Sequence, residues 1–323
     1  MCPETSNPGT VLHALDIDPP AEVERIVGFL RRSVYDVLRK RGAVIQVQGD
    51  VNSAVALALA ERAFASSGVT ALILSQRCGP SQASSMLIAS LLGTETVCED
   101  ITAAIDGFGC DRRRDEAIHH VIPAYHPHTG CTAEIILPPD LLDAESLHLF
   151  HLAVNMPGGR RIVAPLPARQ FLIMIAAAHT RQRIRMSYLY YHAEARNFAV
   201  LSALDCRAYR NGLFAKFGEN GADVLPLVHL YESQVRTLAE YLGVPREILD
   251  AQPSAEQAME CLLGAIDEGI SPEAAAEAAG VPVEEVLHAY RDILHKRQAT
   301  EYSRTGPLML DHAQRSGSSS SPA

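Results

Sequence analysis

The feature that most constrains the fold is a repeated alternation of short β-branched runs with longer apolar segments. Residues 43–48 and 69–74 are predicted to be buried strands, since continuous apolar runs of this length suit a strand covered on both faces. Between them, residues 53–67 are apolar nearly all round, as in a buried helix. The alternation continues through 84–92 (helix), 94–98 (strand) and 101–108 (helix). This order predicts an α/β fold: a doubly wound parallel sheet flanked by helices.

The rest of the chain divides around this unit. Helices are predicted over 21–40, 172–194 and 232–242, a strand over 198–203, and a helical C-terminal part beyond them. Residues 110–170 interrupt the alternation and are interpreted as a small inserted β-containing segment, with strands at 118–125 and 131–137. We therefore expect a flexible N-terminus over 1–17, one domain over 18–312, and a disordered tail over 313–323.

Composition excludes several classes of function. The formal net charge of −10 disfavours broad binding to nucleic acid. No apolar stretch approaches the length of a membrane span, and no signal peptide is visible. The seven scattered cysteines are typical of reduced thiols, so a cytoplasmic location is expected.

The turn after the first predicted strand has the position of a phosphate-binding loop. It reads Gln48, Gly49, Asp50, Val51, Asn52 and Ser53, and either Asn52 or Ser53 could cap the next helix. A carboxylate at Asp50 does not suit a polyphosphate, because two like charges ~4 Å apart repel by about 4 kcal/mol at an effective dielectric near 20. Asp50 could instead act as a base, hydrogen-bond a ligand hydroxyl, or be a surface acid without function.

Several ordered motifs resemble the ammonia-dependent NAD synthetases. They are TRQRIRM at 180–186, LFAKFGENGADVLPLVHLYESQVRTLAEYLGVPREIL at 213–249 and HKRQAT at 295–300. The resemblance implies an adenine-nucleotide α-hydrolase-like fold and a homodimer that binds a nucleotide or dinucleotide. It also implies that ATP and Mg²⁺ activate the nicotinate carboxylate of deamido-NAD as an acyl adenylate, which ammonia converts to the amide.

The ATP half of the resemblance is incomplete. The family turn SGGxDS supplies two glycines and a magnesium-binding Asp, whereas Asn52 stands at that Asp position. Four further positions lack the family residue that contacts phosphate or metal: Thr102, Ala203, Ala208 and Glu232. The residues at the turn therefore predict a degenerate nucleotide-binding loop, and they place both ATP and Mg²⁺ in doubt.

The dinucleotide half matches better. The positions that the resemblance assigns to the substrate are Arg183, Arg185, Lys216, Asp223, His295, Lys296 and Arg297. The chain has only three lysines, and two of them fall on motif lysines. The favoured interpretation is a diverged, ATP-incompetent relative that was repurposed, with no catalytic residue assigned. The alternative is a functional ammonia-dependent NAD synthetase or an amide ligase acting on another carboxylate.

Two other patterns could carry a function. His119, His120, His126, His128, Cys110 and Cys131 lie within 22 residues, but they lack the spacing of a metal motif, so no metal site is assigned. Residues 271–297 resemble a helix-turn-helix, with a cap at Ser271 and a stop at Gly280. Because its second helix opens with Glu284 and Glu285, which would face phosphate, DNA binding is disfavoured.

Overall fold

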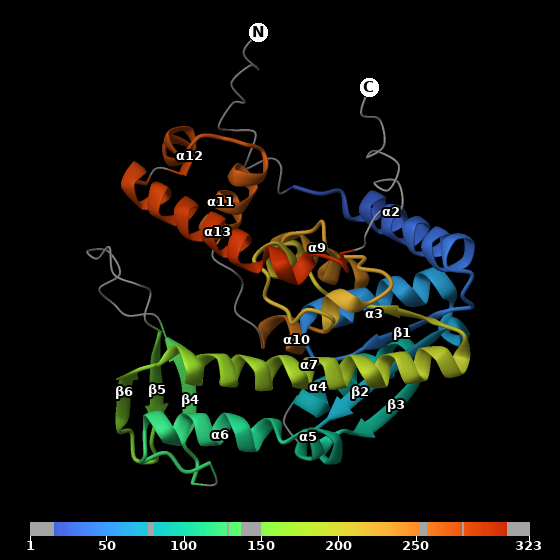
Figure 1. Ribbon diagram of the computed structural model, residues 1–323. Helices are drawn as coiled ribbons and strands as arrows, with labels where there is room; N and C mark the ends of the chain where they lie inside the picture. The colour runs from blue at the N-terminus through green and yellow to red at the C-terminus, as the bar shows by residue number, and fades with distance from the viewer. Residues whose placement is uncertain are drawn as a thin grey trace, which may run out of the picture.

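The central feature of the fold is a four-stranded parallel sheet. The computed structural model describes residues 16–76, 81–127, 129–136, 150–251, 257–279 and 281–308. The strands are β1 (Ala43–Gln46), β2 (Val69–Ser75), β3 (Glu95–Asp100) and β7 (Ala199–Leu201), in the order β3-β2-β1-β7. β1 is central, pairing Ala43 with Val69 on one side and Ala199 on the other. The predicted doubly wound α/β fold is confirmed (Figure 1).

Helices cover both faces of this sheet, since successive strand residues point in opposite directions. Ile45 and Ile73 pack in the cluster formed with α2 (Pro19–Arg31), α3 (Val51–Phe64), α4 (Ser81–Leu92) and α9 (Glu232–Leu242). Val44 and Leu72 point the other way, into the cluster with α5 (Thr102–Phe108) and α7 (Ala168–Arg196). The first helix continues from Arg32 to Val37 as a π-helix, so the predicted helix over 21–40 is close to the observed one.

The insertion folds around a second, antiparallel sheet of order β4-β5-β6. Its strands are β4 (Thr132–Ile136), β5 (His151–Asn155) and β6 (Arg161–Pro165), and they share a core with α6 (Cys110–Val121) and the first half of α7. The predicted strand over 118–125 is wrong, because residues 118–121 belong to α6. Ile118 and Ile122, four residues apart, are both buried in this core, which is the spacing of a helical face. Residues 137–149, which include the end of the second predicted strand, lie outside the described residues.

The C-terminal part is helical, as predicted. It consists of α8 (Cys206–Arg210), α10 (Arg246–Asp250), α11 (Gln257–Asp267), α12 (Pro272–Ala279) and α13 (Val283–Arg304), with one-turn 3₁₀ helices at Ser66–Gly68 and Glu219–Gly221. The last three α-helices share a small core of their own. The predicted stop at Gly280, residues 1–15 of the predicted flexible N-terminus and the whole predicted tail, 313–323, lie outside the described residues. None of the described helices is long and apolar enough to cross a membrane.

Gly42, just before β1, is required by a close approach of two loops. A Cβ atom there would lie 2.3 Å from the carbonyl oxygen of Gly68 and 2.8 Å from the ring of Phe198. We expect Gly42→Ala to lower the free energy of unfolding by about 1–3 kcal/mol through overpacking, measured by urea denaturation. Gly28→Ala is the matched control: a Cβ in that helix meets nothing within 4 Å, so the variant should gain about 0.5–1 kcal/mol from helix propensity. Equal stability of the two variants would contradict the prediction.

Candidate functional site

The turn between β1 and α3 is closed by its own side chains. Gly49 has a left-handed φ of 84°, which favours glycine. The Asp50 carboxylate then caps α3, accepting from the backbone N–H of Ser53 at 2.7 Å. The Ser53 hydroxyl donates to the Asp50 carbonyl at 3.1 Å and accepts from the N–H of Gln48 at 3.2 Å. The predicted cap at Asn52 or Ser53 is therefore wrong, since Asp50 holds that position and keeps an anion at the start of α3.

Asn52 forms a hydrogen bond to a second carboxylate, which follows the neighbouring strand β7 in the chain. Its side-chain amide donates to Oδ2 of Asp205 at 2.9 Å. Asp205 caps α8, with Oδ1 accepting from the N–H of Ala208 at 2.7 Å, and it is only 7% exposed. Sequence reasoning missed Asp205. An Asp directly before a helical segment is a capping signal, but it does not show which residue the side chain meets.

A third carboxylate, that of Glu219, contacts the same turn. Oε1 of Glu219 accepts from the Gln48 side chain at 3.0 Å. Burial raises the pKa of Glu219 and the nearby Asp50 charge raises it further, while the Arg185 guanidinium acts in the opposite direction. Burial likewise lowers the pKa of Arg185. A small cavity at the carboxyl ends of β1 and β7 is lined by Glu219, Gln48, Ser202 and Ala203, which is where open parallel sheets commonly bind ligands.

The raised pKa of Glu219 gives a pH-dependent prediction. A carboxyl whose pKa rises on folding favours the folded state below its unfolded pKa, and this contribution is lost as pH increases through the folded value. Glutamine cannot ionise, yet it keeps the acceptor for Gln48. We expect Glu219→Gln to be more stable than the parent protein at pH 8 and equal to it near pH 4, measured by urea unfolding. The exposed Glu134→Gln controls for the loss of one negative charge. A stability difference that does not change with pH would refute the assignment.

Two of the predicted dinucleotide residues meet at the loop after β7. Nε of Arg183 donates to the carbonyl of Lys216 at 2.9 Å. The Lys216 ammonium donates to the Tyr302 carbonyl at 3.1 Å and lies 4.2 Å from the centre of the Tyr302 ring. The end of α13 therefore holds Lys216 in place.

Asp223 is tied to the sheet. Its Oδ2 accepts from the N–H of Val200 in β7 at 2.8 Å, and its Oδ1 accepts from the Tyr190 hydroxyl at 3.0 Å. Burial raises the pKa of Tyr190, and the Asp223 charge raises it further. These contacts show how Asp223 positions the loop. Its predicted contact with a dinucleotide remains a prediction.

The HKR motif lies on α13, where its three side chains differ in exposure. His295 and Lys296 are exposed, whereas Arg297 is half-buried and donates to Asp267 at 2.8 Å. Asp267 also pairs with Arg210 and accepts from the Tyr231 hydroxyl at 2.8 Å. Burial is the main cause that raises the pKa of Tyr231 to about 12. Nε and Nη2 of Arg297 are buried with no hydrogen-bond partner among the described residues, so this guanidinium keeps donors available.

The four positions that lack a family residue are scattered over nearby elements. The Thr102 N–H donates to Asp100 at the start of α5, and Ala203 lines the small cavity. Ala208 supplies the backbone donor to Asp205, and Glu232 pairs with Arg207 at 3.3 Å. The Arg207 guanidinium therefore partly neutralises the negative charge of Glu232.

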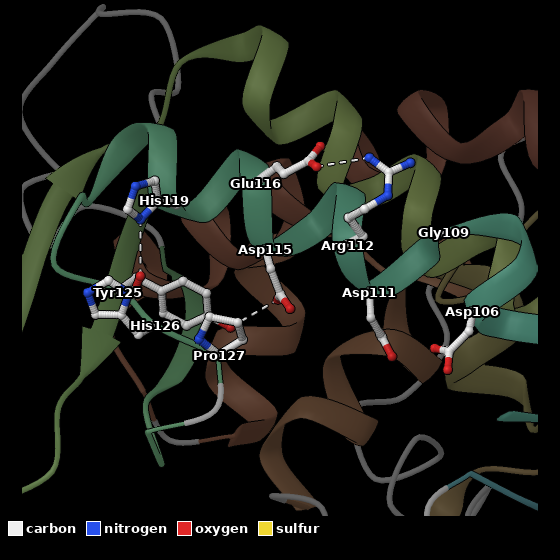
Figure 2. A pocket seen from close by; sticks show the side chains of 10 residues that line it. All are labelled: Asp106, Gly109, Asp111, Arg112, Asp115, Glu116, His119, Tyr125, His126 and Pro127. Carbon is white, nitrogen blue, oxygen red and sulfur yellow. Dashed lines mark hydrogen bonds and ion pairs between the residues drawn. The ribbon is translucent and has the colours of Figure 1, made fainter.

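A cavity of substantial size lies away from these residues. It measures about 500 Å³ and lies over α6, between Asp106 of α5 and the loop with Tyr125 and His126 (Figure 2). None of the predicted site residues lines it. Its main acids are already paired: Asp115 with Arg114 and the Tyr125 hydroxyl, and Glu116 with Arg112. Over the described residues, which exclude His128, no group of three or more His, Cys, Asp or Glu side chains could hold a metal ion.

Comparison with known proteins decides the family. The family model for NAD synthase matches residues 166–303. An NH(3)-dependent NAD(+) synthetase of Rhizobium meliloti is 35% identical over 316 residues, covering 92% of this chain and 93% of that protein. The chain belongs to the NAD synthetase family. A Mesorhizobium japonicum NH(3)-dependent NAD(+) synthetase is also 35% identical, over 91% of this chain and 98% of that protein.

Two solved structures share the fold. The NH3-dependent NAD synthetase of Campylobacter jejuni superposes with a TM-score of 0.63 at 15% identity, covering 91% of this chain and all of that one. The NMN synthetase of Francisella tularensis gives 0.59 at 23% identity, covering 92% and 100%. At these identities the likeness concerns the fold alone.

Proposed function

We propose that the protein is a functional ammonia-dependent NAD synthetase. The observation that carries this proposal is the 35% identity to rhizobial synthetases along nearly the whole length of both chains. The proposed reaction is the ATP-dependent amidation of the nicotinate carboxylate of deamido-NAD. A functional synthetase was the alternative interpretation of the sequence, and an ATP-incompetent relative was the favoured one.

The geometry of the turn supports nucleotide binding at the carboxyl edge of the sheet. The start of α3 and the spare donors of Arg297 are the groups that would hold phosphate oxygens, and the hydrogen bonds of Asp50 and Ser53 that close the turn would then have to open. Mg²⁺ would neutralise phosphate charge and polarise the bonds to phosphorus. The donor set fits such an ion, because Asp205 offers a buried carboxylate beside Asn52.

The proposal has a direct test. Purified full-length protein is incubated with deamido-NAD, MgATP and ammonium, and NAD, AMP and pyrophosphate are measured. We expect formation of all three to depend on ammonium and ATP. If deamido-NAD raises the melting temperature while no AMP or pyrophosphate is released, the ATP-incompetent interpretation is correct instead.

Assembly and location follow from the same proposal. We expect a cytoplasmic homodimer, by resemblance to the family, with each chain contributing 35.0 kDa. Light scattering coupled to size-exclusion chromatography tests this expectation, and a monomer at micromolar concentration would refute it.

A further inference from the structure

Asp205 is a buried carboxylate whose hydrogen-bond partners are both neutral. Its oxygens accept from the Asn52 side-chain amide at 2.9 Å and the Ala208 N–H at 2.7 Å. Among the described residues, Asp205 forms no ion pair within 4.0 Å, although it is only 7% exposed. Buried carboxylates are normally paired with a cation or bound to a metal. Asp205 therefore has the surroundings of a group that meets its cation only when a ligand is bound.

The charges around Asp205 are mixed, with acids near the neighbouring turn and the guanidinium groups of Arg210 and Arg297 near the adjacent Cys206. Asp50 lies on the same turn as Asn52, and its charge is felt by the buried Glu219. The Arg185 charge lowers the pKa of Glu219, and burial lowers the pKa of Arg185 itself. The carboxylates of Asp50 and Asp205 would repel a phosphate chain at the turn, and a metal ion that accompanies the phosphate would offset this repulsion.

The cation must bring part of its own coordination shell. No three carboxylate, His or Cys groups of the described residues lie close enough together to enclose a metal. Mg²⁺ does not require this, because it commonly binds through one or two carboxylates and completes its octahedron with water and substrate phosphates. A single buried carboxylate beside a phosphate-type turn fits that mode of binding.

We infer that Asp205 is the protein carboxylate that binds the Mg²⁺ accompanying ATP, and that Asn52 positions Asp205 through its amide. A metal-binding carboxylate is thus present beside the turn, but the residue that supplies it is Asp205, the N-cap of α8. This inference rests on the proposed function, since it requires that ATP binds at this edge of the sheet.

The competing explanation is that Asp205 only caps α8. Asp205→Asn separates the two roles, because asparagine caps a helix about as well as aspartate and removes only the charge. Asn52→Asp combined with Asp205→Asn moves the carboxylate to the other end of the same hydrogen bond. Glu134→Gln is the matched control, since Glu134 is an exposed acid on β4 that is paired with Arg161, away from the turn.

The experiment measures binding of Mn²⁺, as a spectroscopic substitute for Mg²⁺, by electron paramagnetic resonance with and without ATP. We expect Asp205→Asn to weaken the affinity of the ATP-loaded protein for Mn²⁺ on the order of ten- to a hundredfold, with deamido-NAD binding unchanged. The exchanged double variant should recover most of the affinity, and Glu134→Gln should bind Mn²⁺ like the parent.

The outcomes separate the two proposals. If the parent shows ATP-dependent Mn²⁺ binding and Asp205→Asn retains it in full, the role of Asp205 is refuted while the proposed function stands. If the parent shows no ATP-dependent Mn²⁺ binding, both are refuted. Should Asp205→Asn fail to fold, Asp205→Ser, which also caps a helix, is measured in its place and judged by the same criterion.

Discussion

Replacing Asp267 with asparagine is expected to lower the free energy of unfolding by about 3–5 kcal/mol, the usual cost of removing one partner from a buried ionic group. Asp267 is the last residue of α11, and its side chain is 13% exposed. It forms ion pairs with Arg210 of α8 and Arg297 of α13. It also accepts a hydrogen bond from the hydroxyl of Tyr231 at the start of α9. Without its charge, two guanidinium groups remain close together with no carboxylate between them.

The measurement is urea denaturation of the full chain at neutral pH, followed by circular dichroism. Asp292→Asn is the control, because Asp292 pairs with Lys296 four residues away on the exposed side of α13; that substitution should cost no more than about 0.5 kcal/mol. A loss for Asp267→Asn as small as the control's would show that α11, α8 and α13 are held together by packing alone.

The second large effect is expected in the main core. Leu57 lies in the middle of α3, is fully buried, and packs in the cluster between the sheet, α2 and α9. Leu57→Ala should lower the free energy of unfolding by about 2–5 kcal/mol, through lost apolar burial and the cavity left behind. Leu172→Ala on α7 is the control, because Leu172 is 63% exposed, and its substitution should change stability by no more than about 0.5 kcal/mol. Equal losses for the two would contradict the assigned core.

The sequence predicted the parallel sheet well because its strands are continuous apolar runs between helices of clear periodicity. α9 begins and ends at the predicted residues, since Gly243 stops it with a left-handed φ of 78°. The prediction failed at 118–125, where Ile118 and Ile122 suit either a strand or a helix and only the partner surface decides. Short apolar segments are ambiguous in this way.

The site was harder to predict than the fold. Gln48 and Asn52 were identified, but their partners Glu219 and Asp205 are more than 150 residues away in the chain, and no local pattern connects them. Asp267 was missed for the same reason, since it gains its role only when three helices meet. Asp50 was judged by its charge against a phosphate, whereas the structure shows that the same charge caps α3.

The 29-residue helix α7 belongs to two cores at once. Ile173 and Met174 pack in the core of the small antiparallel sheet, while Ile184 and Leu189 pack against the parallel one. Figure 1 shows α7 running past both sheets. Amide hydrogen exchange should therefore divide this one helix into two zones with different protection. Loosening the antiparallel sheet would speed exchange only as far as the middle of α7, leaving Arg183 and Arg185 on the segment that opens last.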